Sequence, residues 1–213
     1  MRLVCLSDTH GLHGGLTLPA GDALLHAWDC TNRGTLAEVQ AFLTWFAEVG
    51  DFKYRVFTAG NHDFAFEQTP REVRRMMPGN VTYLEDSSVK LGSLKFWGSP
   101  YTPWFHNWAF NCRGQAIEPH WDKIPDDTDV LITHGPPYGV MDKLLDDGLE
   151  VGCPFLKRAL ARCQPRLHVF GHIHEGYGQI QNQDTLFVNA AICDLDYRPV
   201  NASVVVDLEG ARS

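Results

Sequence analysis

Two histidines one residue apart, His172 and His174, lie between an apolar run and a cluster of glycines in the segment VFGHIHEGYG (169–178). Alternate residues of an extended segment point to the same side, so the two imidazoles can converge on one point. Imidazole is a common metal ligand, and a metal ion requires converging donors of this kind. An H-x-H pair by itself is equally compatible with a polar loop whose histidines face water, so the rest of the chain must decide.

Side chains of the metal-ligand type also follow other apolar runs that have the length and composition of strands. The expected strands are RLVCL (2–6), ALLHA (23–27), RVFTA (55–59), DVLIT (129–133) and LHVFG (167–171). In α/β sheets, ligands bind in the crevice beyond the carboxyl ends of the strands. The candidate ligands that follow these five strands are Asp8, His10, Asp29, Asn61, His134, His172 and His174. Five strands that deliver such residues to one rim predict a shared metal site.

The number of candidate ligands indicates two metal ions rather than one. Seven donors exceed what a single tetrahedral or octahedral ion normally uses, and they suit two ions that share a carboxylate. Asp29 follows the strand 23–27, whereas Asp22 precedes that strand and therefore faces the opposite rim. Asp29 is the expected bridging residue. Mixed nitrogen and oxygen ligands leave Mn, Fe and Zn open as the divalent or trivalent ions.

Five motifs in a fixed order resemble those of the calcineurin-like metallophosphoesterases over nearly the whole chain. They are DTH (8–10), DCTNRG (29–34), GNHD (60–63), THGPP (133–137) and GHIH (171–174). The stretch GSPYTPWF (98–105) is similar to the small-protein branch of that family that includes cyclic-nucleotide phosphodiesterases. The resemblance implies an α/β fold with a two-sheet β-sandwich flanked by helices, a single domain over residues 1–213, and the metal site at the carboxyl ends of the strands.

The resemblance also implies a role for each site residue. One metal would be held by Asp8, His10, Asp29 and His174, and the other by Asp29, Asn61, His134 and His172. His62, which neighbours a ligand but is surplus to the metal count, would be the general acid. A hydroxide that bridges two ions can attack phosphorus in line, and an imidazole beside the metals can protonate the leaving oxygen near neutral pH. The expected function is a dinuclear-metal hydrolase of phosphate esters, above all small phosphodiesters such as cyclic nucleotides.

Two residues near the expected bridge are candidates for binding the substrate together with Asn61. Asn32 stands where many members of the family carry an aspartate that orients the acid histidine, and its amide could hydrogen-bond an imidazole instead. Arg33 would reach toward the phosphate of the substrate, or it would be a surface charge ahead of the next helix.

The residues on either side of the expected bridge depart from the family pattern. Trp28 stands where the family places a glycine, and so large a side chain could alter metal occupancy or the shape of the pocket. Cys30 stands where an apolar residue is usual, and it could be a small buried hydrophobe or a thiolate that competes for the metal. A catalytically weakened binding or scaffold module on the same fold is therefore the alternative function. The presence of His62 and of all seven candidate ligands favours the enzyme.

The elements that must position these residues are strands alternating with capped helices. Thr35 and Glu38 form a capping box before a helix with apolar residues at helical spacing, and a short helix begins at Pro70. A further helix is predicted over 154–163. The segment 81–97 reads as a hairpin with its turn at Asp86-Ser87-Ser88, and more strands are expected at 178–181, 185–189 and 202–208.

Several aromatic and histidine residues allow a purely structural role. The aromatic stretch 101–121 could line a pocket and stack on a nucleobase, or it could fold on a small core of its own. His26 and His168 lie inside expected strands, so both are expected to pack in the interior.

The composition restricts the partners. Hydrophobic residues make up 44% and charged residues 21% of the 213 residues, and the net charge is −8. Such values are typical of a globular protein, and the negative charge disfavours binding to long nucleic acid, which leaves a small phosphate ester as the expected partner. The lack of a long apolar run argues against a membrane partner. Six scattered cysteines without a signal peptide predict a reduced, cytoplasmic protein, while the oligomeric state stays open.

Overall fold

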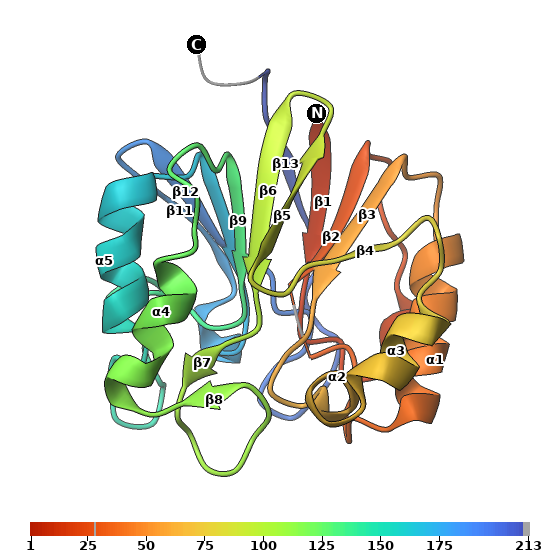
Figure 1. Cartoon of the computed structure of the whole chain (residues 1–213), viewed down its shortest axis with the longest axis horizontal. Helices are drawn as coiled ribbons and strands as arrows, with labels where there is room; N and C mark the ends of the chain where they lie inside the picture. Colours follow the sequence, from red (N-terminus) through yellow and green to blue (C-terminus); the bar gives the residue numbers. More distant parts are fainter. Residues whose placement is uncertain (28, 211–213) are drawn as a thin grey trace.

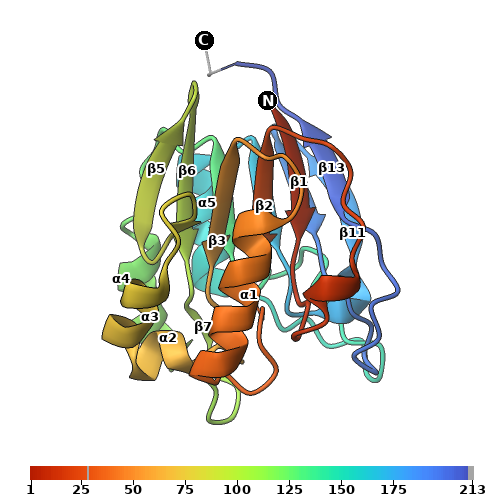
Figure 2. The same ribbon diagram turned by 90° about the vertical axis from the view of Figure 1, so that its right-hand side faces the viewer.

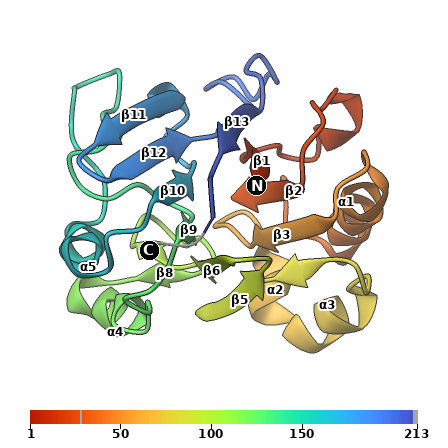
Figure 3. The same cartoon turned by 90° about the horizontal axis from the view of Figure 1, so that it is seen from above.

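The computed structural model describes residues 1–27 and 29–210, which form two packed β-sheets with helices on their outer faces (Figure 1). Seen from above, the sheets form two layers, with α1 and α3 outside one of them and α4 and α5 outside the other (Figure 3). This arrangement confirms the predicted α/β fold with two parallel-rich sheets flanked by helices.

The first sheet carries three of the five strands that precede candidate ligands. Across the sheet its order is β13 (Val204–Asp207), β1 (Arg2–Leu6), β2 (Ala23–Ala27), β3 (Tyr54–Thr58) and β4 (Thr82–Tyr83). Strands β1 to β4 are parallel, and β13 is antiparallel to β1 at the edge. Leu6 is level with His26, and His26 with Phe57, so β1, β2 and β3 end at the same height.

The second sheet contains the other two strands that precede candidate ligands. Its order is β11 (Gly178–Asn182), β12 (Thr185–Asn189), β10 (Leu167–Phe170), β9 (Val130–Thr133), β6 (Leu94–Ser99) and β5 (Ser87–Leu91). The four central strands are parallel, and β11 and β5 are antiparallel edge strands. A small parallel pair, β7 (Thr102–Pro103) and β8 (Asn111–Cys112), lies beyond the carboxyl ends of the main strands (Figure 1).

Five helices lie in the described part of the chain, and three of them begin where the sequence pattern predicts a helix. They are α1 (Leu36–Glu48), α2 (Phe64–Gln68), α3 (Pro70–Met76), α4 (Glu118–Trp121) and α5 (Pro154–Cys163), with 3-10 turns at His13–Gly15, Gly114–Ile117 and His174–Gly176. The capping box of Thr35 and Glu38 is present, with both reciprocal hydrogen bonds. In α1 the buried face includes Phe42, whereas Leu36 is 37% exposed. The helix 154–163 and the helix start at Pro70 are as predicted.

The hairpin predicted over 81–97 is wrong in its first half. Thr82 and Tyr83 pair in parallel with β3 of the first sheet, and the Leu84 amide donates to the Phe57 carbonyl at 2.9 Å. The true hairpin joins β5 to β6, with its reversal at Gly92, whose φ of +60° suits glycine. The chain therefore crosses from one sheet to the other where the sequence pattern suggested a turn.

The hydrophobic core consists of two clusters on opposite faces of the second sheet, and successive residues of one strand belong to them in turn. Val130 and Ile132 of β9 belong to the main cluster between the sheets, whereas Leu131 belongs to a smaller cluster under α4 and α5 that includes Trp97 and Trp121. Both faces of the second sheet are thus covered, as a central parallel sheet requires. His26 and His168 are fully buried in β2 and β10, in agreement with their predicted packing role.

The two sheets are joined at the carboxyl end of β1. The Ser7 amide donates to the Ala190 carbonyl at 2.8 Å, and the Ile192 amide donates to the Ser7 carbonyl at 2.9 Å. The end of β1 is thereby held against the segment that follows β12. This link places the strand ends of both sheets along one rim. Figure 2 shows β13, β1, β2 and β3 side by side in this order, with α1 in front of the sheet. Among residues 1–27 and 29–210, no helix combines the length and the apolar character needed to cross a bilayer.

Candidate metal centre

All seven predicted ligands meet at the rim formed by the carboxyl ends of β1, β2, β3, β9 and β10. Three clusters of potential ligand atoms, each within 4.8 Å of one another, are Asp8–His10–His174, His10–Asp29–His62 and Asp29–His134–His172. Because His10 and Asp29 each belong to two clusters, the three form one continuous array with Asp29 near its middle. Asn61 joins the array through its side-chain oxygen, which contacts the Nε2 of His134.

Five of the seven candidate ligands line a cavity of about 170 Å³, namely His10, Asp29, Asn61, His172 and His174. Asp8 and His134 are fully buried, and Asp29 is 2% exposed. Among the described residues that line the cavity there is no lysine or arginine; aromatic and apolar side chains complete its wall, namely Phe105, Trp108, Leu195 and Tyr197. The only basic side chains among the described residues of its wall are therefore the imidazoles of His10, His62, His172 and His174.

Four of the candidate ligands have a backbone conformation that only glycine adopts freely. The φ angles are +51° at Asp8, +43° at His10, +45° at Asp29 and +69° at His172. A non-glycine residue in the left-handed region costs about 1–3 kcal/mol, and such residues concentrate at functional sites. The conformation turns each side chain sharply away from its strand and toward the rim.

Two glycines allow the candidate ligands to approach the backbone. A Cβ on Gly60 would lie 2.0 Å from Asp29 Oδ1, and a Cβ on Gly171 would lie 1.9 Å from Asp8 Oδ2. The same space on Gly171 is bordered by Ser7 Oγ, which itself donates to Asp8 Oδ2 at 2.6 Å. Neither carboxylate can retain its place if these glycines carry a side chain.

Gly171→Ala should therefore displace Asp8 and lower both metal content and stability. Forcing a methyl group into a packed site typically costs about 1–3 kcal/mol of the free energy of unfolding. Gly15→Ala is the matched control, because a Cβ there meets no atom within 4 Å. Metal analysis and denaturant unfolding of both variants test the expectation, and unchanged metal content in Gly171→Ala would contradict it.

Backbone carbonyls orient two of the imidazoles. The Nδ1 of His174 lies 2.9 Å from the carbonyl of Asp194, and a carbonyl can only accept, so Nδ1 carries the proton. The Nε2 of His174 is thus left for the rim, where it lies 3.5 Å from Asp8 Oδ1. In metal-binding histidines, one ring nitrogen commonly donates a hydrogen bond to the protein while the other binds the metal.

A buried chain of hydrogen bonds supports the turn that carries His134. The Thr133 hydroxyl donates to the Gly135 carbonyl at 2.9 Å, so it must accept from the Nε2 of His168, which lies 2.7 Å away. The Nε2 of His26 lies 3.0 Å from the hydroxyl of Thr9, the residue between Asp8 and His10. The two interior histidines thus brace the turns that present candidate ligands.

Burial keeps most of the imidazoles in the neutral form. It lowers the pKa of His10 to about 3 and that of His172 to about 4, and together with the nearby His172 ring it holds the pKa of His134 well below its usual value. A neutral imidazole is the form that binds a metal, so these side chains need not lose a proton first. Burial alone would lower the pKa of His174, but the hydrogen bond and the charge of Asp8 raise it to about 9.

An ionised Asp29 would be stabilised by a cation beside it. Burial, Asp63 and Asp8 raise the pKa of Asp29 well above its usual value, because an isolated charge is costly there. Neither ring nitrogen of His10 has a well-formed hydrogen bond among the described residues, although the side chain is only 6% exposed. Buried polar groups are rarely left without a partner. The donor set, and the cost of an ionised Asp29 without a cation, therefore fit bound metal ions.

Asp63 connects the two loops that carry Asp29 and Asn61, and sequence reasoning assigned it no role. Its fully buried carboxylate accepts from the Thr31 hydroxyl at 2.7 Å, the Thr31 amide at 2.9 Å and the Gly60 amide at 2.7 Å. The thiol of Cys30 lies 3.4 Å from the same carboxylate and has a pKa raised well above its usual value by burial and by Asp63. Cys30 is therefore a buried thiol rather than a thiolate, and it lies outside the clusters of candidate ligands.

His62 lies in the cavity between aromatic side chains. Its ring stacks on Trp108 with the centroids 4.2 Å apart, and it meets the ring of His10 edge to face with the centroids 4.8 Å apart. The ring of Tyr197 contacts His10 at 4.6 Å. Trp108 belongs to the aromatic stretch 101–121 that was expected to line a pocket, whereas no local pattern in the sequence indicates Tyr197. Asp63, in contrast, stands within the GNHD motif and could have been identified there.

The predicted role of Asn32 requires a correction. The group that faces the Nδ1 of His62, at 3.0 Å, is the backbone carbonyl of Asn32 and not its side-chain amide. Arg33 is exposed, and its amide donates to Glu38 at 3.1 Å. The prediction about Trp28 lies outside the described residues. In the aromatic stretch 101–121, Phe105 and Trp108 line the cavity, whereas Trp121 packs in the smaller core cluster. Stacking of this stretch on a nucleobase stays a prediction.

Comparison with known proteins finds similar sequences and similar folds. A family model described as calcineurin-like phosphoesterase matches residues 1–176. The human metallophosphoesterase domain-containing protein 1 is 40% identical over 236 residues, which cover the whole of this chain and 72% of that protein. The solved structure of the phosphopantetheinyl hydrolase PptH from Mycobacterium tuberculosis has a TM-score of 0.65 at 13% identity and covers 95% of both chains. At that identity the structural likeness concerns the fold alone.

Proposed function

The chain belongs to the calcineurin-like phosphoesterase family, and we propose that it hydrolyses small phosphodiesters, cyclic nucleotides among them, with the help of two metal ions. The observation that carries the proposal is the continuous array of three ligand clusters that share His10 and Asp29. The metal ions would be Mn, Fe or Zn, because nitrogen and oxygen donors are mixed and no thiolate takes part.

The array divides into two sets of ligands around Asp29. Asp8, His10, Asp29 and His174 would hold one ion, and Asp29, Asn61, His134 and His172 would hold the other. When bound, such a pair of ions supplies an activated water as the nucleophile and polarises the phosphoryl oxygens of the substrate. The protein contributes the rigid turns of Asp8, Asp29 and His172, which hold the donors in place before the substrate arrives.

His62 is the residue that we assign to protonation of the leaving oxygen. Its Nδ1 donates to the Asn32 carbonyl at 3.0 Å, so Nε2 is the nitrogen that can release a proton toward the cavity. The stacked ring of Trp108 fixes the plane of the imidazole. A positioned imidazole of this kind typically contributes about 10²–10⁴-fold to the rate.

The wall of the cavity favours a diester over a monoester. A monoester carries a second negative charge, and the described lining offers no lysine or arginine to balance it. A diester carries a single charge and a second organic group, which suits the rings of Phe105, Trp108 and Tyr197. Asn61 lies at the metal array, where its amide would also reach the phosphate, while Asn32 and the exposed Arg33 would contact a substrate only from the edge of the site.

A catalytically weakened binding module is the less favoured reading. It would require the loss of a ligand or of the acid, and His62 and all seven candidate ligands are in place. Cys5, Cys30, Cys112, Cys153 and Cys193 are free thiols, which supports our proposal of a reducing, cytoplasmic location.

The proposed function is tested by metal analysis and by a comparison of two generic esters. Protein reconstituted with Mn, Fe or Zn should bind two ions per chain, and its kcat/KM for bis(4-nitrophenyl) phosphate should exceed that for 4-nitrophenyl phosphate by about tenfold, a difference equivalent to about 1.4 kcal/mol. Protein treated with a chelator should hydrolyse neither. Activity that survives full removal of metal would overturn the proposal, and a clear preference for the monoester would overturn its diester part.

A further inference from the structure

A second cavity, of about 440 Å³, adjoins the metal centre. It shares Phe105, His172 and Leu195 with the smaller cavity that the candidate ligands line. A substrate whose phosphate lies at the metal array can therefore extend directly into this space. We call it the side pocket.

The walls of the side pocket are mainly apolar. Trp104, Leu144, Val151 and Ile173 line it, and the described lining contains no lysine or arginine. Glu175 is its one carboxylate among these residues, and that side chain lies 3.4 Å from the amide of Leu145. An anionic group in this pocket would be desolvated and would face a carboxylate, so a second phosphate is disfavoured there.

Apolar side chains at the mouth of the pocket are exposed to water. The exposed fractions are 45% for Trp104, 54% for Phe105 and 55% for Leu195. Covering apolar surface of this kind contributes about 25 cal/mol for each Å² removed from water. An apolar group in the pocket would therefore bind favourably, and its size would be limited by the pocket walls.

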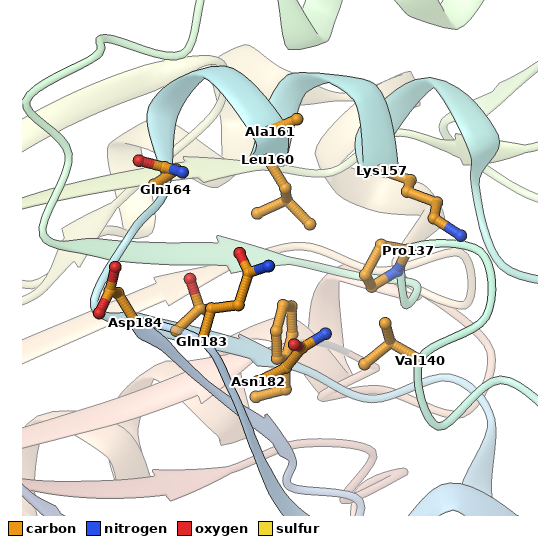
Figure 4. Close-up of a pocket in the computed structure, with 11 residues that line it drawn as sticks. Pro137, Val140, Lys157, Leu160, Ala161, Gln164, Asn182, Gln183 and Asp184 are labelled. Carbon is orange, nitrogen blue, oxygen red and sulfur yellow. The ribbon is translucent and has the colours of Figure 1, made fainter.

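A third cavity differs in both place and character. It lies between α5 and the turn that joins β11 to β12, and Figure 4 shows Lys157, Gln164, Gln183 and Asp184 around it. It shares no lining residue with the metal centre or with the side pocket. The cavity beside α5 is therefore out of reach of a substrate at the metal centre. Another cavity, of about 390 Å³, does share His174 and Leu195 with the metal centre. Charged side chains such as Asp194, Asp196 and Arg198 line it, so the side pocket is the neighbouring cavity that suits an apolar group.

We propose that the side pocket binds an uncharged apolar substituent, alkyl or aryl, of a phosphodiester whose phosphate lies at the metal centre. The inference rests on the proposed function and adds the class of substrate. Phosphodiesters with a short polar substituent leave the pocket unfilled, and those with a second anionic group meet Glu175. Selectivity for the apolar substituent arises from Leu144 and Val151, which come from the segment between β9 and α5.

Esters with a common leaving group test the proposal. Methyl, butyl and octyl 4-nitrophenyl phosphate release the same nitrophenolate, so differences among them arise from the alkyl chain. The kcat/KM of the metal-loaded protein should rise by about two- to fourfold for each buried methylene until the pocket is full, mainly through a lower KM. Equal kcat/KM for the methyl and octyl esters would overturn the inference and leave the proposed function intact. Failure to hydrolyse any of the three would overturn both.

Two variants and a matched control test whether the side pocket produces the preference for long alkyl chains. Leu144→Gln should reduce the preference for the octyl ester by at least about fivefold while the methyl ester keeps its rate, because a polar group replaces apolar wall. Val151→Phe should also lower octyl turnover, by filling the pocket. Leu145→Gln is the control, since Leu145 is 74% exposed and does not line the pocket. If Leu144→Gln and Leu145→Gln behave alike on all three esters, the side pocket is not the site of selection and the inference fails.

Discussion

Replacing Asp29 by asparagine should remove metal from the rim and lower phosphodiester hydrolysis by about 10³-fold or more. Metal ions supply several kcal/mol of transition-state stabilisation, and each 1.36 kcal/mol corresponds to about tenfold in rate. Asp29 belongs to two of the three ligand clusters, so its loss affects both proposed ions. The asparagine oxygen can still accept from the His62 amide, now 3.0 Å from Asp29 Oδ1, so the neighbouring loop should stay in place. Metal content and kcat/KM are the measurements.

The same variant should be more stable than the wild type when metal is absent. Burial, Asp63 and Asp8 raise the pKa of Asp29, which means that its charge destabilises the metal-free fold above the pKa of the unfolded chain. A neutral amide removes that penalty, so Asp29→Asn should melt at a higher temperature than the wild type in the presence of a chelator. Adding metal should raise the melting temperature of the wild type but not that of the variant.

Asp22→Asn is the matched control for Asp29→Asn. Asp22 is exposed at the amino end of β2, where its carboxylate accepts from the Arg2 amide at 2.6 Å. This control should keep both metal content and activity. Two ions per chain in Asp29→Asn would contradict the assignment of Asp29 as the shared ligand.

Replacing His62 by alanine should leave the metal content unchanged but slow the hydrolysis of alkyl diesters by about 10²–10⁴-fold. Protonation matters most when the leaving oxygen is strongly basic, so esters of 4-nitrophenol should lose much less. The comparison requires a dialkyl phosphate and a 4-nitrophenyl ester measured on the same preparation, together with its metal analysis.

His106→Ala controls for the loss of a histidine near the site. His106 is exposed in the segment between β7 and β8 and does not line the cavity. Equal losses on both ester types in His62→Ala would count against its role as the acid. Loss of one ion would instead identify His62 as a ligand, a role that its place in the cluster with His10 and Asp29 would permit.

The sequence by itself determined which strands carry the site and which residues meet there. The apolar runs 2–6 and 23–27 are strands with those bounds, and β3 differs from its predicted range by one residue. Parallel strands of one sheet end at a common edge, so the residue types after each strand suffice to predict convergence. The choice of Asp29 over Asp22 as a ligand follows from the same local rule, because one ends the strand and the other begins it.

Only the tertiary structure decided which sheet the segment 81–85 joins. Its alternating pattern suits an edge strand of either sheet, and the pairing of Thr82 with Val56 depends on packing between segments far apart in the chain. When distant residues determine the register or the partner of a strand, the local sequence pattern does not predict them.

The detailed chemistry of the site was likewise decided by long-range packing. The left-handed backbone at Asp8, His10, Asp29 and His172 is held by surrounding contacts, since isolated residues of these types rarely adopt it. The residue type of Asn32 suggested a side-chain contact with His62, whereas the fold presents its backbone carbonyl, which every residue possesses. Trp108 against His62 and the apolar side pocket combine loops whose relative positions are set by the two sheets. Residue types and spacing specify which groups are available, but contacts between distant segments determine which atoms face one another.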